Sequence, residues 1–352
     1  MTRLLILATT AVVVVAAELT MRAVGGIAEE PLWWHDLFTQ RKEMQMRRLG
    51  RRGGVDIVVI GSSKMLFGVD PTVIAERTGF TCFNASIYRG VPTVTEAWLA
   101  DRVLPLLRPK VVVVGMSPTE VNDNSPLIGR LDEYRAARVF HLRRGQRVVR
   151  AVGLHVFLVR YAGLLVHPRK LLRLIRQASR RPEVWRWRVP AEIPGVLGSG
   201  GDALDFLSRS YFNGPRMREL IRQQAGVNYD NGGVQSGAYR RMVALCAAYG
   251  ARLLFAAMPA SQEFLDDLIE GGRRTWQREW ERLRALAQEA GTAVVDPAGE
   301  FEDHRYFADM VHMNGVGRAA YSAALADALM PQLSSLGLKR DVSVRRDVRQ
   351  AG

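Results

Sequence analysis

The sequence predicts an α/β protein in which a doubly wound parallel sheet is covered by helices on both faces, giving three layers, α/β/α. Short apolar runs of strand length at 55–61, 80–86 and 110–117 alternate with helical segments. The same alternation returns with runs at 251–259 and 292–297. The chain has 352 residues, of which 48% are hydrophobic, so it can fill a sizeable core.

The first segment of the chain predicts export. Arg3 is followed by an uncharged apolar run from Leu4 to Ala17. If the helix continues past Glu18 it is long enough for a tilted membrane anchor, and Trp33 and Trp34 suit an interfacial position. A cleaved signal, with Ala17 at the cleavage site, is the alternative. We expect a membrane anchor or signal at 1–24, a juxtamembrane stalk at 25–52, and an extracytoplasmic domain after them.

The first half of the predicted domain, which spans 53–338, contains three strands. The strand at 55–61 ends in a polar turn, Gly61 to Lys64. A short helix should begin after the N-cap Asp70, with Pro71 in its first position, and end at Gly79. The strand at 80–86, a helix over 93–107 and the strand at 110–117 follow. Continuous apolar strands of this kind are typical of a buried parallel sheet.

The alternation breaks between about 124 and 235, where we expect a helical insertion rich in arginine. Its basic helices either face solvent or bind anionic lipid headgroups or an anionic polymer. The basic residues that favour a binding surface are Arg143, Arg144, Arg147, Arg150, Lys170, Arg173 and Arg176. A basic tail is expected at 339–352.

The net charge of +14 favours a neutral or anionic partner. Nucleic acid is not favoured, because no zinc-ligand spacing, RNA-binding aromatic signature or basic zipper accompanies the charge.

The second half of the domain resumes with a helix at 236–250 and the strand at 251–259. A long helix should end near Ala290, and a helix at 315–333 should close the domain after the last strand. Cys82 and Cys246 are predicted to be free, buried thiols, since a metal site needs more ligands at closer spacing. No metal is expected, and His141, His155 and His167 show no metal-ligand spacing.

Two segments carry residues suited to nucleophilic catalysis. Ser63 follows the first strand, and the carboxyl ends of parallel strands are where such sheets place their ligands. Asp309 and His312 lie in a loop with two residues between them, so the carboxylate can hold the imidazole while the other ring nitrogen accepts a proton from a serine. Together they predict a Ser63, His312 and Asp309 triad.

These segments resemble the conserved blocks of the SGNH (GDSL-like) hydrolase superfamily, over roughly 53–125 and 235–335. Gly61 to Ser63 match block I, with Ser63 as the nucleophile. The motif Asp309, Met310, Val311, His312 matches block V, including the Asn314 and Gly317 that follow. The resemblance implies a flavodoxin-like fold that needs no cofactor.

The expected oxyanion-hole residues are less regular. The segment from Phe83 to Thr93 resembles block II, in which Gly90, or else Ser86, would donate to the oxyanion. Block III departs from the family, because Ser117 and Pro118 stand where an Asn-Asp pair is usual. Ser117, or Asn122 folding back, would have to replace the missing asparagine. Loss of one such donor costs about a hundredfold in turnover.

The serine-proline pair also resembles the membrane-anchored branch related to polysaccharide O-acetylation and lipoteichoic-acid D-alanylation proteins. This resemblance implies an O-acetyltransferase or acetylesterase that acts on a cell-envelope or exported polysaccharide, with a membrane O-acyltransferase as a partner. Two alternatives remain: a catalytically weak domain that binds a glycan or an assembly complex, and an esterase acting on lipids. The sequence leaves open the acyl group, the acceptor and the oligomeric state.

Overall fold

The structure, a computed structural model, divides the chain into two compact units. One contains residues 1–40 and 131–194, and the other contains 41–130 and 195–352. The residues that it describes are 2–25, 37–132, 134–135, 156–161, 164–165, 168–180, 200, 211, 214–223 and 228–337. The second unit holds the sheet and every candidate site residue named above.

The sheet has five parallel strands in the order β2-β1-β3-β4-β5. This is the strand order of flavodoxin-like doubly wound sheets. The strands are β1 (Ile57–Ile60), β2 (Cys82–Asn84), β3 (Val111–Met116), β4 (Arg252–Ala257) and β5 (Val294–Val295). Each lies inside one of the apolar runs predicted as strands, so the expected α/β class with a parallel sheet is confirmed.

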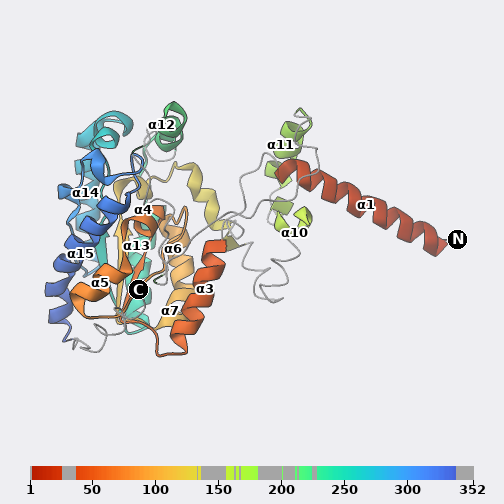
Figure 1. The fold of residues 1–352 in the computed structure, drawn as a ribbon. Coiled ribbons are helices and arrows are strands. Elements are labelled where there is room, and N and C mark those ends of the chain that lie inside the picture. The colour runs from red at the N-terminus through yellow and green to blue at the C-terminus, as the bar shows by residue number, and fades with distance from the viewer. Residues whose placement is uncertain are drawn as a thin grey trace. The chain divides into compact units, whose positions relative to one another are not determined.

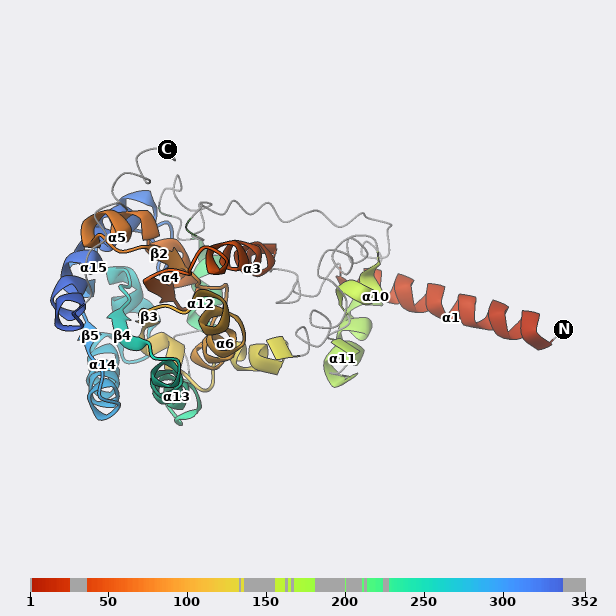
Figure 2. The ribbon, with the colours of Figure 1, turned by 90° about the horizontal axis from the view of Figure 1, so that it is seen from below.

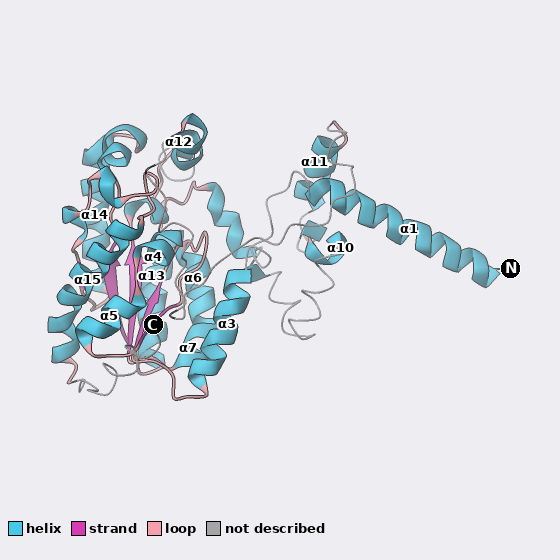
Figure 3. Ribbon diagram, viewed as in Figure 1, coloured by secondary structure: helices cyan, strands magenta, loops and turns pink. Residues whose placement is uncertain are grey.

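Helices lie on both faces of this sheet (Figures 1 and 2). One face carries α5 (Pro71–Thr78) and α15 (Gly315–Ser335), and the other carries α6 (Pro92–Trp98), α7 (Leu104–Leu107), α13 (Val234–Ala248) and α14 (Gly272–Glu289). Figure 3 shows the strands enclosed between these helices. Alternate residues of each strand point to opposite faces, so Ile57 and Val59 pack in one core with Tyr321 and Leu325 of α15.

The capping signals around α5 are confirmed. The Asp70 side chain accepts a hydrogen bond from the backbone N–H of Thr72, and Gly79 ends the helix in the left-handed conformation at φ 76°. The helix expected over 93–107 is interrupted by a π turn at Leu99–Val103. Pro105, the second residue after this turn, has no N–H to continue the α-helical pattern.

The first unit contains α1 (Thr2–Gly25), α10 (Phe157–Arg160) and α11 (Pro168–Ala178). Met21 and Val24 of α1 pack with Phe157 and other apolar residues of α10 and α11. The Glu18 carboxylate accepts hydrogen bonds from the backbone N–H groups of Phe157 and Leu158, at 2.9 and 3.0 Å. The N-terminal segment and the arginine-rich insertion therefore share one small core.

Among the residues that the structure describes, no helix combines the length and apolar character needed to cross a membrane. The membrane anchor stays a prediction. Much of the predicted basic surface, Arg143, Arg144, Arg147 and Arg150, lies outside the described residues, as do His141, His155 and His167 and the tail at 339–352. Arg173 and Arg176 lie on α11. Between β3 and β4 the described residues contain helices, including α12 (Pro215–Ile221), and no strand.

The segment expected as a stalk contributes to the second unit. Residues from Arg41 onward belong to that unit and form most of α3 (Leu37–Gly50). Lys42 is fully buried, and its ammonium donates to the backbone carbonyls of Asn84 and Ser86 at 2.8 and 2.5 Å. The burial of Lys42 cannot be recognised from a polar, basic helix pattern, because its partners are carbonyls at and just after the end of β2.

Candidate active site

Ser63 lies at the carboxyl end of β1, where the strand passes directly into α4 (Ser63–Gly68). Ser62 is the N-cap of that helix, and its hydroxyl accepts a hydrogen bond from the Lys64 backbone N–H at 3.2 Å. Because Ser63 is the first helical residue, its own N–H has no partner within the helix. The turn thus presents both a hydroxyl and a backbone donor at the sheet edge.

The loop that carries Asp309 and His312 is fixed by its own backbone. Phe307 and Met313 form an antiparallel bridge, and the Ala308 N–H donates to the carbonyl of His312 at 2.8 Å. Asn314 caps α15 by accepting from the Gly317 N–H at 3.0 Å. A Cβ on Gly317 would lie 2.0 Å from the Tyr306 carbonyl oxygen, which explains why this position is glycine.

Ser63, His312 and Asp309 form a continuous series of hydrogen bonds. His312 Nε2 lies 2.8 Å from Ser63 Oγ, and His312 Nδ1 lies 2.8 Å from Asp309 Oδ2. The backbone N–H groups of Val311 and His312 both donate to Asp309 Oδ1 at 2.9 Å. The structure therefore brings together the three side chains that sequence analysis selected, although 249 positions separate Ser63 from His312.

The Asp309 carboxylate is 4% exposed and has a pKa below its usual value. Burial raises this pKa, but the charge of His312 and the hydrogen bonds from His312 and Val311 outweigh burial. Asp309 is therefore ionised at neutral pH and can stabilise a protonated imidazole. The Phe67 ring meets the His312 ring edge to face at 5.4 Å, which further restricts the imidazole.

A cavity of about 100 Å³ opens beside Ser63 and His312. Its apolar wall is formed by Val91, Leu127 and Val311 among others. Such a volume accommodates a small acyl group and falls well below the roughly 300 Å³ at which pockets for larger ligands begin. The cavity lies within the second unit.

A network of charged and hydroxyl side chains lies beside the turn that carries Ser63. Lys64 is 7% exposed, and its ammonium donates to the hydroxyls of Ser117 and Thr119 at 2.9 and 2.7 Å. Glu120 accepts hydrogen bonds from the hydroxyls of Ser62 and Tyr239. The residue preceding the candidate nucleophile and the residue following it are thus both tied to the segment after β3.

Burial dominates the electrostatics of this network. Burial lowers the pKa of Lys64 to about 8, against the opposing charges of Glu120 and Asp309. Burial likewise raises the pKa of Glu120, although Lys64 and the hydroxyls of Ser62 and Tyr239 act in the other direction. Each charge makes the other less costly to bury.

Gly90 and Ser86, the two residues of the second block expected to donate to the oxyanion, differ in their surroundings. Gly90 lies between Arg89 and Val91, both of which line the cavity, and a Cβ on it would approach the Gly61 carbonyl to 2.9 Å. Ser86 is buried, and its hydroxyl has no hydrogen-bond partner among the residues that the structure describes. Gly90 is therefore the residue that the backbone holds next to the turn carrying Ser63.

Ser117 and Asn122 are both engaged in the segment after β3. The Ser117 hydroxyl is fully buried and bonded to Lys64 and Thr119. The Asn122 side-chain oxygen accepts from the backbone N–H groups of Asn124 and Asp230, at 3.0 and 3.1 Å. These contacts hold a loop together, and the role of either residue as an oxyanion donor stays a prediction.

Sequence analysis placed Lys64 only in the polar turn after the first strand and did not select Glu120. A single acidic residue in a polar turn carries no periodic signal, so its place near Lys64 could be found only from the fold. The His304 side chain is 76% exposed and packs against Tyr211. Cys246 is a buried free thiol and Cys82 is a half-buried one. Within the described part of the chain, no group of three or more His, Cys, Asp or Glu side chains could hold a metal ion.

Fold and site together define a doubly wound α/β protein with a serine, histidine and aspartate hydrogen-bonded at the carboxyl edge of its sheet. No family model matches the chain. No curated protein matches it either. Solved structures with a similar course of the chain include an acetyl xylan esterase, AlAXEase, at 13% identity and a TM-score of 0.37, covering 79% of this chain and 99% of that one. This likeness is too low to bear on the reaction.

Proposed function

We propose that this protein is an SGNH-type serine acyl-transfer enzyme, an O-acetyltransferase or acetylesterase that acts on a cell-envelope or extracellular glycan. The observation that carries the proposal is the 2.8 Å contact of Ser63 Oγ with His312 Nε2, with Asp309 2.8 Å from the other ring nitrogen. Nucleophile, base and orienting carboxylate are the parts that acyl transfer requires. The glycan and the export of the domain come from the sequence resemblance and the N-terminal segment.

In the first half-reaction, Ser63 Oγ attacks the carbonyl carbon of an ester while His312 Nε2 takes the hydroxyl proton. Asp309 stabilises the imidazolium that results. The tetrahedral intermediate then expels the alcohol, which receives the proton from His312, and an acyl-serine remains. The backbone N–H groups of Ser63 and Gly90 are the expected donors to the oxyanion.

In the second half-reaction, a hydroxyl of a sugar or of water attacks the acyl-serine. His312 accepts the proton of that hydroxyl and returns it to Ser63 Oγ, so the acyl group moves to the acceptor and the enzyme is restored. The small volume beside Ser63, about 100 Å³, favours an acetyl group over a long acyl chain. It therefore disfavours an esterase of long-chain lipids.

A second candidate function is a catalytically weak domain that binds a glycan or an assembly partner. It is favoured by one observation: the side chains of Ser117 and Asn122, which were expected to replace the missing asparagine, already bond to Lys64 and to loop N–H groups.

The deciding experiment compares hydrolysis of p-nitrophenyl acetate by the full chain and by Ser63→Ala. We expect the variant to lose at least a thousandfold in rate, because the nucleophile is absent. Ser334→Ala, which changes an exposed serine near the C-terminal end of α15, serves as the matched control. Equal rates for the full chain and Ser63→Ala would reject the enzyme and favour the binding domain. Adding oligosaccharide acceptors then separates transfer from hydrolysis.

A further inference from the structure

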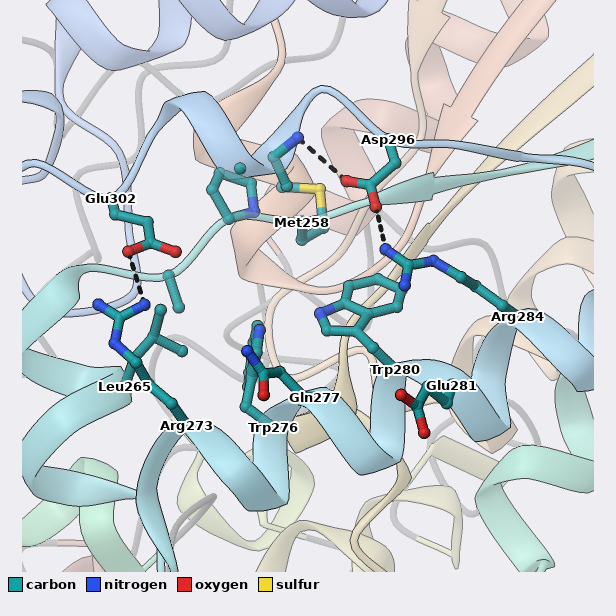
Figure 4. Close-up of a pocket in the computed structure, with 14 residues that line it drawn as sticks. Met258, Leu265, Arg273, Trp276, Gln277, Trp280, Glu281, Arg284, Asp296 and Glu302 are labelled. Carbon is teal, nitrogen blue, oxygen red and sulfur yellow. Dashed lines mark hydrogen bonds and ion pairs between the residues drawn. The ribbon is translucent and has the colours of Figure 1, made fainter.

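A second cavity, of about 290 Å³, opens on α14 and on the loops that follow β4 and β5. Figure 4 shows the side chains of Trp276, Gln277 and Trp280 on α14 facing Met258 and Asp296 across it. The α14 residues that line it, from Arg273 to Arg284, recur at spacings of three and four, so they share one face of the helix. The cavity lies outside the Ser63 site and is not used by the proposed mechanism.

The aromatic rings at and beside this cavity meet edge to face. The rings of Trp276 and Trp280 are 6.2 Å apart with an interplanar angle of 79°, and Trp276 meets Phe264 in the same manner. Trp280 is 6% exposed, whereas Trp276 is half-buried and reaches the surface. Trp276 therefore offers an apolar face to the cavity, and the buried Trp280 ring contacts Trp276 edge to face.

The two arginines beside the tryptophans, Arg273 and Arg284, are already paired. Arg273 bonds to Asp266 at 2.6 Å and to Glu302 at 2.9 Å, and Arg284 bonds to Asp296 at 2.7 Å. An anionic ligand would have to displace a carboxylate from one of these arginines. A wholly apolar ligand would have to desolvate the ion pairs.

A neutral polyhydroxylated ring fits both features. The C–H face of a sugar can stack on Trp276, while its hydroxyls donate to the carboxylates and accept from the guanidinium groups without adding net charge. The volume of about 290 Å³ is at the small end of the range for ligand pockets, about 300–1,000 Å³, and suits one or two rings.

The cavity is connected to the loop that carries His312. Ala260 and Leu265 of its wall pack in one apolar cluster with Met310 and Val311. The Ser261 hydroxyl also donates to the Met310 carbonyl at 2.9 Å. Both cavities thus lie at the carboxyl edge of the sheet, joined by shared packing.

We infer that this cavity is a subsite for a neutral sugar ring of a glycan chain, separate from the acyl-transfer site and centred on Trp276. The inference deepens the proposed function, since it names neutral oligosaccharides as the chemical class bound beside that site. Binding itself does not require catalysis, so the two can fail independently.

The test measures binding of cellohexaose, xylohexaose and chitohexaose to the full-length Ser63→Ala protein, by calorimetry and tryptophan fluorescence. We expect saturable binding of at least one of them, and a loss of affinity of about tenfold or more in Trp276→Ala. Trp276→Phe keeps a stacking face and should lose less. Arg274→Ala changes an exposed residue on α14 that does not line the cavity, and should bind as the parent does.

Three outcomes would overturn the inference: no binding of any neutral hexasaccharide, binding unchanged in Trp276→Ala, or binding of oligogalacturonate alone. If Trp276→Ala does not fold, Gln277→Ala takes its place with the same expected direction. Ester hydrolysis by the protein with an intact Ser63 is measured separately, so a failure of the sugar subsite is distinguishable from a failure of the proposed chemistry.

Discussion

The two cavities at the carboxyl edge of the sheet use charge in opposite ways. Beside Ser63, Lys64 and Asp309 are buried and Glu120 is half-buried, and all three are held by hydrogen bonds to hydroxyls or backbone groups. Beside Trp276, the ion pairs are partly exposed to solvent; the side chains of Arg273 and Glu302 are 40% and 36% exposed. Buried charges are expensive to leave unpaired, whereas exposed pairs contribute little to stability. The first arrangement suits a fixed chemical site and the second suits recognition.

The largest expected effect tests the first cavity. Asp309→Asn should lower the rate of ester hydrolysis by about 10⁴-fold, because the imidazolium loses its counter-charge and the imidazole adopts the wrong tautomer. Steady-state rates with p-nitrophenyl acetate measure this. Asp303→Asn, an exposed neighbour in the same segment, should retain the parent rate. A loss below tenfold in Asp309→Asn would remove Asp309 from the mechanism.

The next effect concerns stability. Lys64→Met should destabilise the fold by about 1 kcal/mol at pH 7, because the hydroxyls of Ser117 and Thr119 lose a charged donor and Glu120 loses its counter-charge, while the cost of burying the ammonium is also removed. Urea denaturation measures the free energy of unfolding. In the double variant that combines Lys64→Met with Glu120→Gln, part of the lost stability should be regained, because no unpaired charge then remains. If the double variant is as unstable as the sum of its single changes, the two groups do not act as a pair.

The pH dependence of stability tests whether the Lys64 ammonium is buried beside Ser63. In the folded protein burial lowers the pKa of Lys64 to about 8, from an ordinary value of 10.5. Between these pH values the unfolded chain holds a proton that the folded protein has lost, so raising the pH favours the folded state. Relative to Lys64→Met, the parent should gain up to about 3 kcal/mol between pH 8 and 10.5. A constant difference across this window would show that the ammonium is not buried.

The smallest effect tests whether the two cavities are separate. Trp276→Ala should leave the rate on p-nitrophenyl acetate within about twofold, because this small ester reaches only the cavity beside Ser63. The same variant is expected to bind hexasaccharides more weakly. A parallel loss of both properties, with the fold intact, would mean that the two cavities act as one site.

The elements that could be predicted from sequence are those with a local or periodic signal. Apolar runs identified all five strands, and Asp70, Pro71 and Gly79 fixed the ends of α5. Hydrophobic periodicity did not reveal the π turn before Pro105, because that turn depends on a missing N–H and not on the spacing of apolar residues. It did not reveal the burial of Lys42 either, because that burial depends on Asn84 and Ser86, which are distant in sequence.

The same division applies to the candidate site. Ser63 could be selected because it follows the first strand, and Asp309 and His312 because of their spacing in one loop and their resemblance to a known motif. Glu120 could not, and neither could the ion pairs of Asp296 and Glu302 with arginines of α14. Ion pairs between two segments cannot be predicted from the spacing of residues within either segment.

The sequence by itself determined the parallel sheet and the three residues at its edge, since apolar runs, caps and short motifs act within a few residues of the chain. Only the tertiary structure decided that Lys64 is buried beside Ser63 with Glu120 half-buried near it, and that Trp276 faces a polar cavity. Burial and pairing of charges depend on which segments meet in space, and that depends on the packing of the whole unit.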